Sequence, residues 1–151
     1  MSSEPTTIAV DHRQLGVDLF NHVWTLLSKQ PRTQAEDDEM LHCAHASRFH
    51  WGQVGAPDNL ARGEWQCSRV YAVLGRGEPA VHHARRCLEL CEANGIGDWD
   101  LAFAYEALAR AHGVAGDSEE AERCKRLARQ AGNAIAEPED RELFDSDYAT
   151  L

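Results

Sequence analysis

The chain has 151 residues, a length that suits one domain with a single buried core. Its 15 lysine and arginine residues face 25 aspartate and glutamate residues; the formal net charge of -10 argues against nucleic acid or an anionic membrane surface as a partner. No stretch approaches the roughly 18 consecutive apolar residues of a membrane-spanning helix, and the start lacks the features of a secretory signal, so we expect a cytoplasmic location.

Apolar residues recur every three or four positions along most of the chain, and strand signals are nearly absent, so the expected fold is all-α. Residues 1–10 are expected to be a flexible N-terminus. A first helix is expected over residues 11–28. Thr33 and Glu36 have the form of a capping box, which predicts the start of a second helix that includes residues 39–51.

Four further helices are expected between turns that contain glycine, and they span residues 59–74, 80–93, 101–114 and 120–135. The acidic segment 137–151 contains Leu143, Phe144 and Tyr148. We therefore expect it to add one short helical turn that packs on the preceding helices as a cap, with docking on a partner subunit as the alternative. Six main helices joined by short turns predict stacked antiparallel hairpins over residues 11–136, followed by this cap.

The five cysteines have no CxxC spacing, and their odd number fits reduced, buried thiols better than a disulfide framework or a zinc knuckle. Two of them, Cys87 and Cys91, follow His82 and His83 on one expected helix. Three ligands spread over two helical turns would span about 12 Å, which is too far for one ion. A structural role in the seam between hairpins is therefore expected for this cluster.

An internal repeat supports the hairpin arrangement. Arg48, Arg69 and Arg110 each stand a few residues before a glycine-containing turn, and they are 21 and then 41 residues apart. In the last unit, small and aromatic residues follow the spacing of a helix, a turn and a second helix. They are Tyr105, Leu108, Ala109, Gly116, Ala121 and Ala128.

These residues resemble the tetratricopeptide-repeat family. The previous unit, residues 62–94, keeps Tyr71, Gly75 and Ala80 of the same pattern but places Trp65 one residue late. The offset of 41 residues also departs from the family's repeat of about 34. The resemblance implies a concave surface, formed by the first helix of each hairpin, that binds a peptide or another protein.

In the register of that family, six residues of two helices face the groove and form a mixed surface of aromatic and charged side chains; they are Arg62, Trp65, Arg69, Phe103, Glu106 and Arg110. Arginine forks bind carboxylate or phosphate, and a tryptophan offers a flat stacking face, so an acidic peptide or a small anion is the expected ligand. In the alternative interpretation the two aromatic residues belong to the core, and Arg69 pairs with Glu106 inside the bundle.

A metal site is a second hypothesis, because the eight histidines are roughly twice the share expected from average composition. His42 and His45 lie three residues apart on one expected helix, so both imidazoles could reach one ion of zinc, iron or nickel. His22 on the first helix is the candidate third ligand. No sequence feature marks a nucleophile or a phosphate-binding loop. A third hypothesis is that the protein is a scaffold subunit that forms a homodimer.

Overall fold

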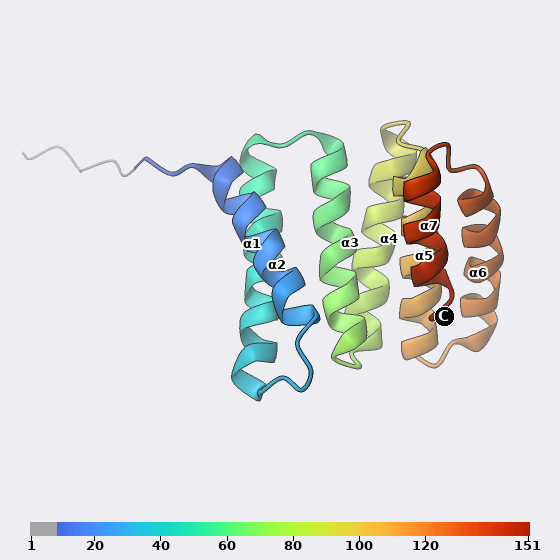
Figure 1. The fold of residues 1–151 in the computed structure, drawn as a ribbon, viewed down its shortest axis with the longest axis horizontal. Coiled ribbons are helices and arrows are strands. Elements are labelled where there is room, and N and C mark those ends of the chain that lie inside the picture. Colours follow the sequence, from blue (N-terminus) through green and yellow to red (C-terminus); the bar gives the residue numbers. More distant parts are fainter. Residues whose placement is uncertain (1–8) are drawn as a thin grey trace, which may run out of the picture.

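The computed structural model describes residues 9–151, which form helices and no strand (Figure 1). Most of the predicted N-terminal segment 1–10 lies outside the described residues. The helices are α1 His12–Leu27, α2 Gln34–Val54, α3 Pro57–Val73, α4 Gly77–Ala93, α5 Asp98–Val114, α6 Ser118–Asn133 and α7 Pro138–Tyr148. The all-α prediction is confirmed, and the six main helices agree with it to within about three residues at each end.

The predicted helix ends are confirmed where side chains cap them. At the start of α2, the Glu36 amide donates to the Thr33 hydroxyl, while the Thr33 amide donates to the Glu36 carboxylate. At the start of α6, the Asp117 carboxylate accepts from the Glu120 amide. Gly116 precedes this cap with a φ of 83°, a left-handed conformation that favours glycine and reverses the chain between α5 and α6.

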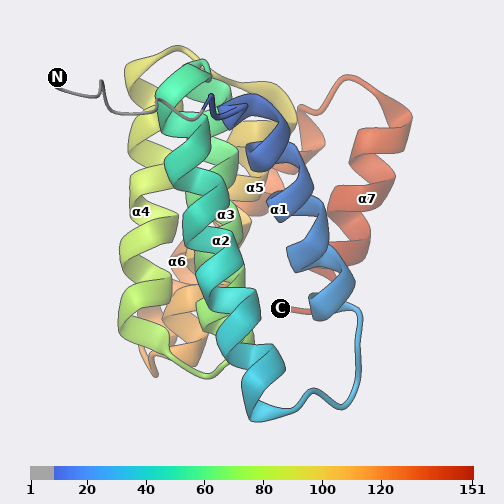
Figure 2. The ribbon, with the colours of Figure 1, turned by 90° about the vertical axis from the view of Figure 1, so that its left-hand side faces the viewer.

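Consecutive helices pack as three antiparallel hairpins, α1–α2, α3–α4 and α5–α6 (Figure 1). The odd-numbered helices also contact one another in series, α1 with α3, α3 with α5 and α5 with α7. Figure 2 shows α1 and α7 on the side of the molecule away from α4. The four odd-numbered helices therefore share one face of the stack, and α1 and α7 stand at its two edges.

The C-terminal segment forms a full helix, so the prediction of one short helical turn was wrong in length. Pro138 suits the first turn of α7, and the helix is held by Phe144, which is completely buried against Phe103 and Gly132. A Cβ atom at Gly132 would overlap the Phe144 ring, so glycine provides the space for this contact. The expectation that this segment packs on the last hairpin as a cap agrees with these contacts.

The rest of the core is built from small side chains, which allow the helices to approach closely. Buried alanines occur in five of the helices, and four of the five cysteines are buried and all are free thiols. Cys87 and Cys91 of α4 pack with Ala61 of α3 and Ala104 of α5, which is the seam position expected for them. Within the described part of the chain, no helix has both the length and the apolar character needed to cross a membrane.

Candidate functional site

The face shared by the odd-numbered helices carries a groove of about 490 Å³, which we call the aromatic groove. Every odd-numbered helix contributes side chains to it, and most of the lining is apolar. The lining residues are Phe20, Trp24, Arg62, Trp65, Cys87, Trp99, Asp100, Phe103, Asp140, Leu143 and Asp147. Three residues of the predicted site, Arg62, Trp65 and Phe103, are brought together here.

Aromatic rings form a continuous chain of contacts across this groove. The Trp65 ring centroid lies 5.6 Å from that of Trp24 on α1 and 5.9 Å from that of Phe103 on α5. Trp99 stands one turn before Phe103, with ring centroids 6.4 Å apart. Tilted and edge-to-face pairs at these distances are favourable, so the rings support one another and form a preorganised surface.

Trp65 also provides an unused hydrogen-bond donor. Its indole Nε1 atom is buried, and no acceptor within the described chain lies in hydrogen-bond range. A buried donor without a partner costs about 1–3 kcal/mol.

Arg62 is fixed at the edge of the aromatic groove by two neighbours. Its Nε and Nη2 atoms donate to the two carboxylate oxygens of Asp100, each at 3.1 Å, and its guanidinium carbon lies 4.5 Å from the ring centroid of Trp99. The hydrogen bond to Asp100 raises the pKa of Arg62 despite partial burial. This arginine already has a carboxylate partner within the protein.

The other two predicted arginines lie beside the aromatic groove in a buried ion network. Arg110 Nε donates to Glu106 at 3.0 Å, and Arg69 Nη2 lies 3.5 Å from the same carboxylate, whose side chain is completely buried. Arg69 also donates to Asp147 of α7 at 3.1 Å, and Arg110 donates to the Thr150 hydroxyl at 2.6 Å. The alternative interpretation, in which Arg69 pairs with Glu106 inside the bundle, is confirmed.

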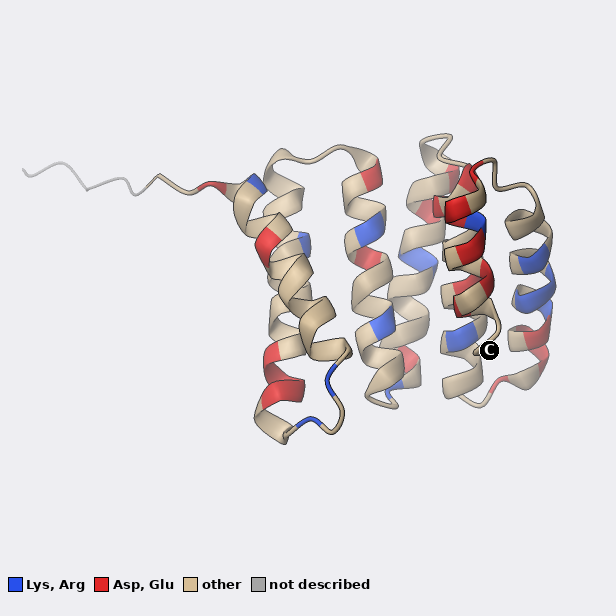
Figure 3. Cartoon of the chain, viewed as in Figure 1, with Lys and Arg blue, Asp and Glu red and all other residues tan. Residues whose placement is uncertain are grey.

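The helix at the far edge gives this face an acidic character. α7 carries five carboxylates against one arginine, and Figure 3 shows them gathered on this helix. Asp140 and Asp147 of α7 line the aromatic groove directly. Since Arg62, Arg69 and Arg110 are already paired, the reason for expecting an acidic ligand is lost.

Glu64 of α3 forms a second ion network with residues of α2 and α4. Its carboxylate accepts from Arg48 Nε at 3.2 Å and lies 2.6 Å from His83 Nδ1. His83 stacks on Tyr71, with ring centroids 5.6 Å apart. Burial raises the pKa of Glu64, but the hydrogen bond with His83 and the charges of His83 and Arg48 outweigh it and lower that pKa overall.

The predicted metal ligands do not come together. His22 Nε2 on α1 lies 3.0 Å from Glu39, whereas His45 Nε2 lies 2.9 Å from the Tyr71 hydroxyl on α3. Burial and the neighbouring His83 lower the pKa of His45. Among residues 9–151, His22, His42 and His45 do not join any group of three candidate ligands within 4.8 Å of one another. The expectation of a shared site fails because two of these histidines have different neighbours.

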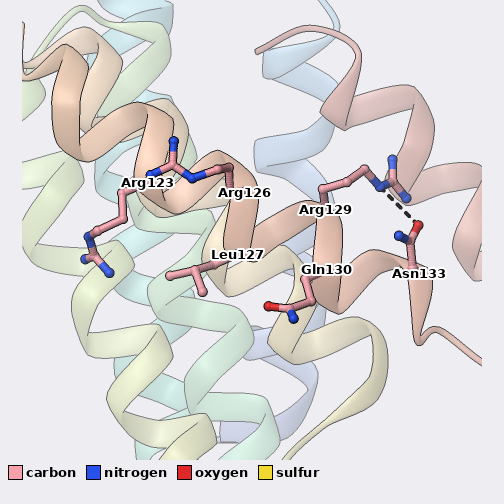
Figure 4. Close-up of a pocket in the computed structure, with 6 residues that line it drawn as sticks. All are labelled: Arg123, Arg126, Leu127, Arg129, Gln130 and Asn133. Atoms are coloured by element: carbon pink, nitrogen blue, oxygen red, sulfur yellow. Dashed lines mark hydrogen bonds between the residues drawn. The ribbon is translucent and has the colours of Figure 1, made fainter.

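Another depression, of about 550 Å³, lies on α6 alone (Figure 4). Arg123, Arg126 and Arg129 line it together with other residues of the same helix. Arg129 donates to Asn133 at 3.2 Å and to Asp145 at 2.8 Å, and Arg123 pairs with Glu120. This surface is therefore the exposed face of a single helix, with two of its three arginines already paired, and the aromatic groove is the better candidate site.

Comparisons of the chain with protein-family models, with curated proteins and with solved structures gave no match. Sequence reasoning missed the other lining residues of the aromatic groove, which are Phe20, Trp24, Cys87, Trp99, Asp100, Asp140, Leu143 and Asp147. One signal was present in the sequence: Phe20 with Trp24, and Trp99 with Phe103, are aromatic pairs four residues apart. Which helices face each other could not be read from such spacing.

Proposed function

We propose that the protein is an interaction module of the helical-repeat kind, similar in build to tetratricopeptide-repeat proteins, and that it acts in the cytoplasm. Its occupant is an extended segment of a partner protein with apolar side chains and at least one basic residue, bound in the aromatic groove. The observation that carries this proposal is the contiguous aromatic lining of the groove, bordered by the carboxylates of Asp140 and Asp147.

Exposed apolar area supports binding at this place. Leu143 is 62% exposed and Trp24 is 37% exposed, although both are large and apolar and stand at opposite edges of the groove. Covering such side chains releases about 25 cal/mol for each Å² of apolar surface removed from water.

The charge of the groove favours a basic occupant over the acidic one expected from the sequence. The Arg62 guanidinium is neutralised by Asp100, while Asp140 and Asp147 add negative charge at the α7 edge. Aromatic faces attract a lysine or arginine side chain through their quadrupole, with about 0.5–2 kcal/mol for each contact. Aromatic rings beside carboxylates are therefore complementary to a segment that alternates apolar and basic residues.

Tryptophan fluorescence tests this proposal directly, because Trp24, Trp65 and Trp99 line the groove and only Trp51 lies elsewhere. Two short amidated peptides are titrated, one alternating leucine with lysine and the other leucine with glutamate. We expect saturable quenching with the lysine peptide and weaker binding of the glutamate peptide. Equal binding of both would contradict the charge argument, and no binding of either would contradict the proposal.

A pair of variants locates the binding. Leu143→Arg places a positive charge at the groove edge. We expect it to lower the affinity for the lysine peptide by about tenfold, equivalent to about 1.4 kcal/mol of binding free energy. Phe49→Arg is the matched control, because Phe49 is 59% exposed on α2 and does not line the groove. Equal effects of the two variants would place the peptide elsewhere on the surface.

A further inference from the structure

The turn between α5 and α6 gathers a set of metal-ligating side chains that the proposed groove function does not use. His112 lies in the last turn of α5, and Glu120 and Cys124 follow on α6. One ligand atom from each of these residues lies within 4.8 Å of the other two. Across residues 9–151, this is the one group of three histidine, cysteine, aspartate or glutamate side chains that meets that distance.

Local geometry explains why these residues meet. Glu120 and Cys124 are four residues apart and therefore share one face of α6. The reversal at Gly116 brings that face against the end of α5, where His112 is only 8% exposed. A fourth donor is close, since Asp117 Oδ2 lies 4.0 Å from His112 Nδ1. The other oxygen of Asp117 caps α6, so the backbone holds this carboxylate in place.

The donor types select one class of ion. An imidazole nitrogen, a thiolate sulfur and carboxylate oxygens suit zinc, whereas magnesium and calcium prefer oxygen alone. Ligand atoms around tetrahedral zinc stand roughly 3.5 Å apart, as follows from bond lengths of about 2.0–2.3 Å. The three ligand atoms lie within 4.8 Å of one another, so the side chains close toward the ion when it binds.

Two positively charged side chains lie beside the cluster. The negative charge of the ligands has to exceed their positive charge if a cation is to bind. Arg123 pairs with Glu120 at 2.9 Å, but both side chains are well exposed, so solvent screens this pair and it yields easily. Arg85 lies across the open depression, of about 640 Å³, that also exposes His112 and Asp117 to solvent. One thiolate and two carboxylates around a divalent ion leave one negative charge, which the neighbouring arginines offset.

We propose that His112, Asp117, Glu120 and Cys124 bind one zinc ion that ties the end of α5 to the start of α6. Binding converts the Cys124 thiol to a thiolate and releases its proton to solvent, and no oxidant or reductant is involved. This site lies on a different part of the molecule from the aromatic groove. The zinc proposal and the groove proposal can therefore be confirmed or contradicted independently of each other.

Cobalt(II) is the probe, because a thiolate ligand gives it a charge-transfer absorption band that histidine and carboxylate ligands do not. The full-length protein is reduced with a phosphine and titrated with cobalt chloride. We expect the band to saturate at one equivalent and to disappear when zinc chloride displaces the cobalt. Absence of the band would overturn the proposal.

Matched variants locate the site. Cys124→Ser should abolish the band, while Cys43→Ser, which alters a thiol on α2, should keep it. Because Cys124 is buried, a second pair avoids any question of folding: Glu120→Gln should weaken cobalt binding by about tenfold or more, and Glu119→Gln on the same exposed turn should not. A band that survives Cys124→Ser, or equal affinities of the two glutamine variants, would overturn the assignment.

Discussion

Two buried glutamates on neighbouring helices hold their charges in different ways. Glu106 of α5 has a completely buried side chain between Arg69 and Arg110, neither of which can release its charge. Glu64 of α3 has a side chain that is 12% exposed, and it is shared by Arg48 and His83. The Glu64 network therefore pairs a carboxylate that solvent reaches with one guanidinium and one imidazole, whereas the Glu106 network pairs a fully buried carboxylate with two guanidinium groups.

The difference shows what the repeated arginines do. Arg48, Arg69 and Arg110 recur at matched sequence positions, yet each one neutralises a buried carboxylate, and none extends freely into the aromatic groove. α7 completes the Glu106 network by bringing Asp147 to Arg69. The repeated arginines therefore stabilise the contacts between helices, and the aromatic groove lies beside them.

The largest expected effect is that of Glu106→Ala. The substitution leaves two partly buried guanidinium groups without their carboxylate, and breaking a buried ion pair costs about 3–5 kcal/mol. Urea denaturation should show this loss in the free energy of unfolding. The control is Glu142→Ala on the exposed side of α7. A loss below about 1 kcal/mol would mean that Glu106 does not hold the arginines in place.

Glu64→Ala should cost less, about 1–3 kcal/mol, because the Glu64 side chain is 12% exposed and solvent reaches this network. The same denaturation measurement applies, with Glu92→Ala on the exposed end of α4 as the control. A cost equal to that of Glu106→Ala would show that solvent exposure does not reduce the cost of breaking this network, and the comparison of the two networks would fail.

Helix positions could be predicted from the sequence because their signals are local. The Thr33 and Glu36 capping box and the glycine turns act within a few residues, so the six main helices were placed correctly. α7 was underestimated because its length depends on the burial of Phe144 against α5 and α6. The periodicity of residues 141–147 alone could not show that contact.

The candidate site could be predicted only in part, for a related reason. Arg62, Trp65 and Phe103 were found because a family register places them on one face. Their partners lie far along the chain: Asp100 is 38 residues from Arg62, and Asp147 is 78 residues from Arg69. Such pairings depend on how the hairpins stack, and spacing within one helix carries no information about them.

Asp147→Ala should lower the free energy of unfolding only modestly, by about 1 kcal/mol or less. The reason is that the side chains of Asp147 and Arg69, which form the ion pair, are both partly exposed. It also removes a carboxylate from the aromatic groove and leaves Arg69 with Glu106 alone. The difference in affinity between the lysine peptide and the glutamate peptide, measured in the fluorescence titration, should therefore become smaller. Asp145→Ala, which alters an exposed carboxylate of α7 outside the groove lining, should leave the preference unchanged.

The smallest expected effect is a change in the pH dependence of stability at Glu64. Its pKa is lowered in the folded protein, so its stabilising contribution is complete above the unfolded pKa of about 4.3 and is lost as the pH falls through the folded pKa. Glu64→Gln removes that titration. The free energy of unfolding of the unaltered protein should therefore fall more steeply than that of the variant between roughly pH 5 and pH 3. Identical slopes would show that the Arg48 and His83 contacts do not favour the charged carboxylate, and Glu64 would then differ from Glu106 in burial alone.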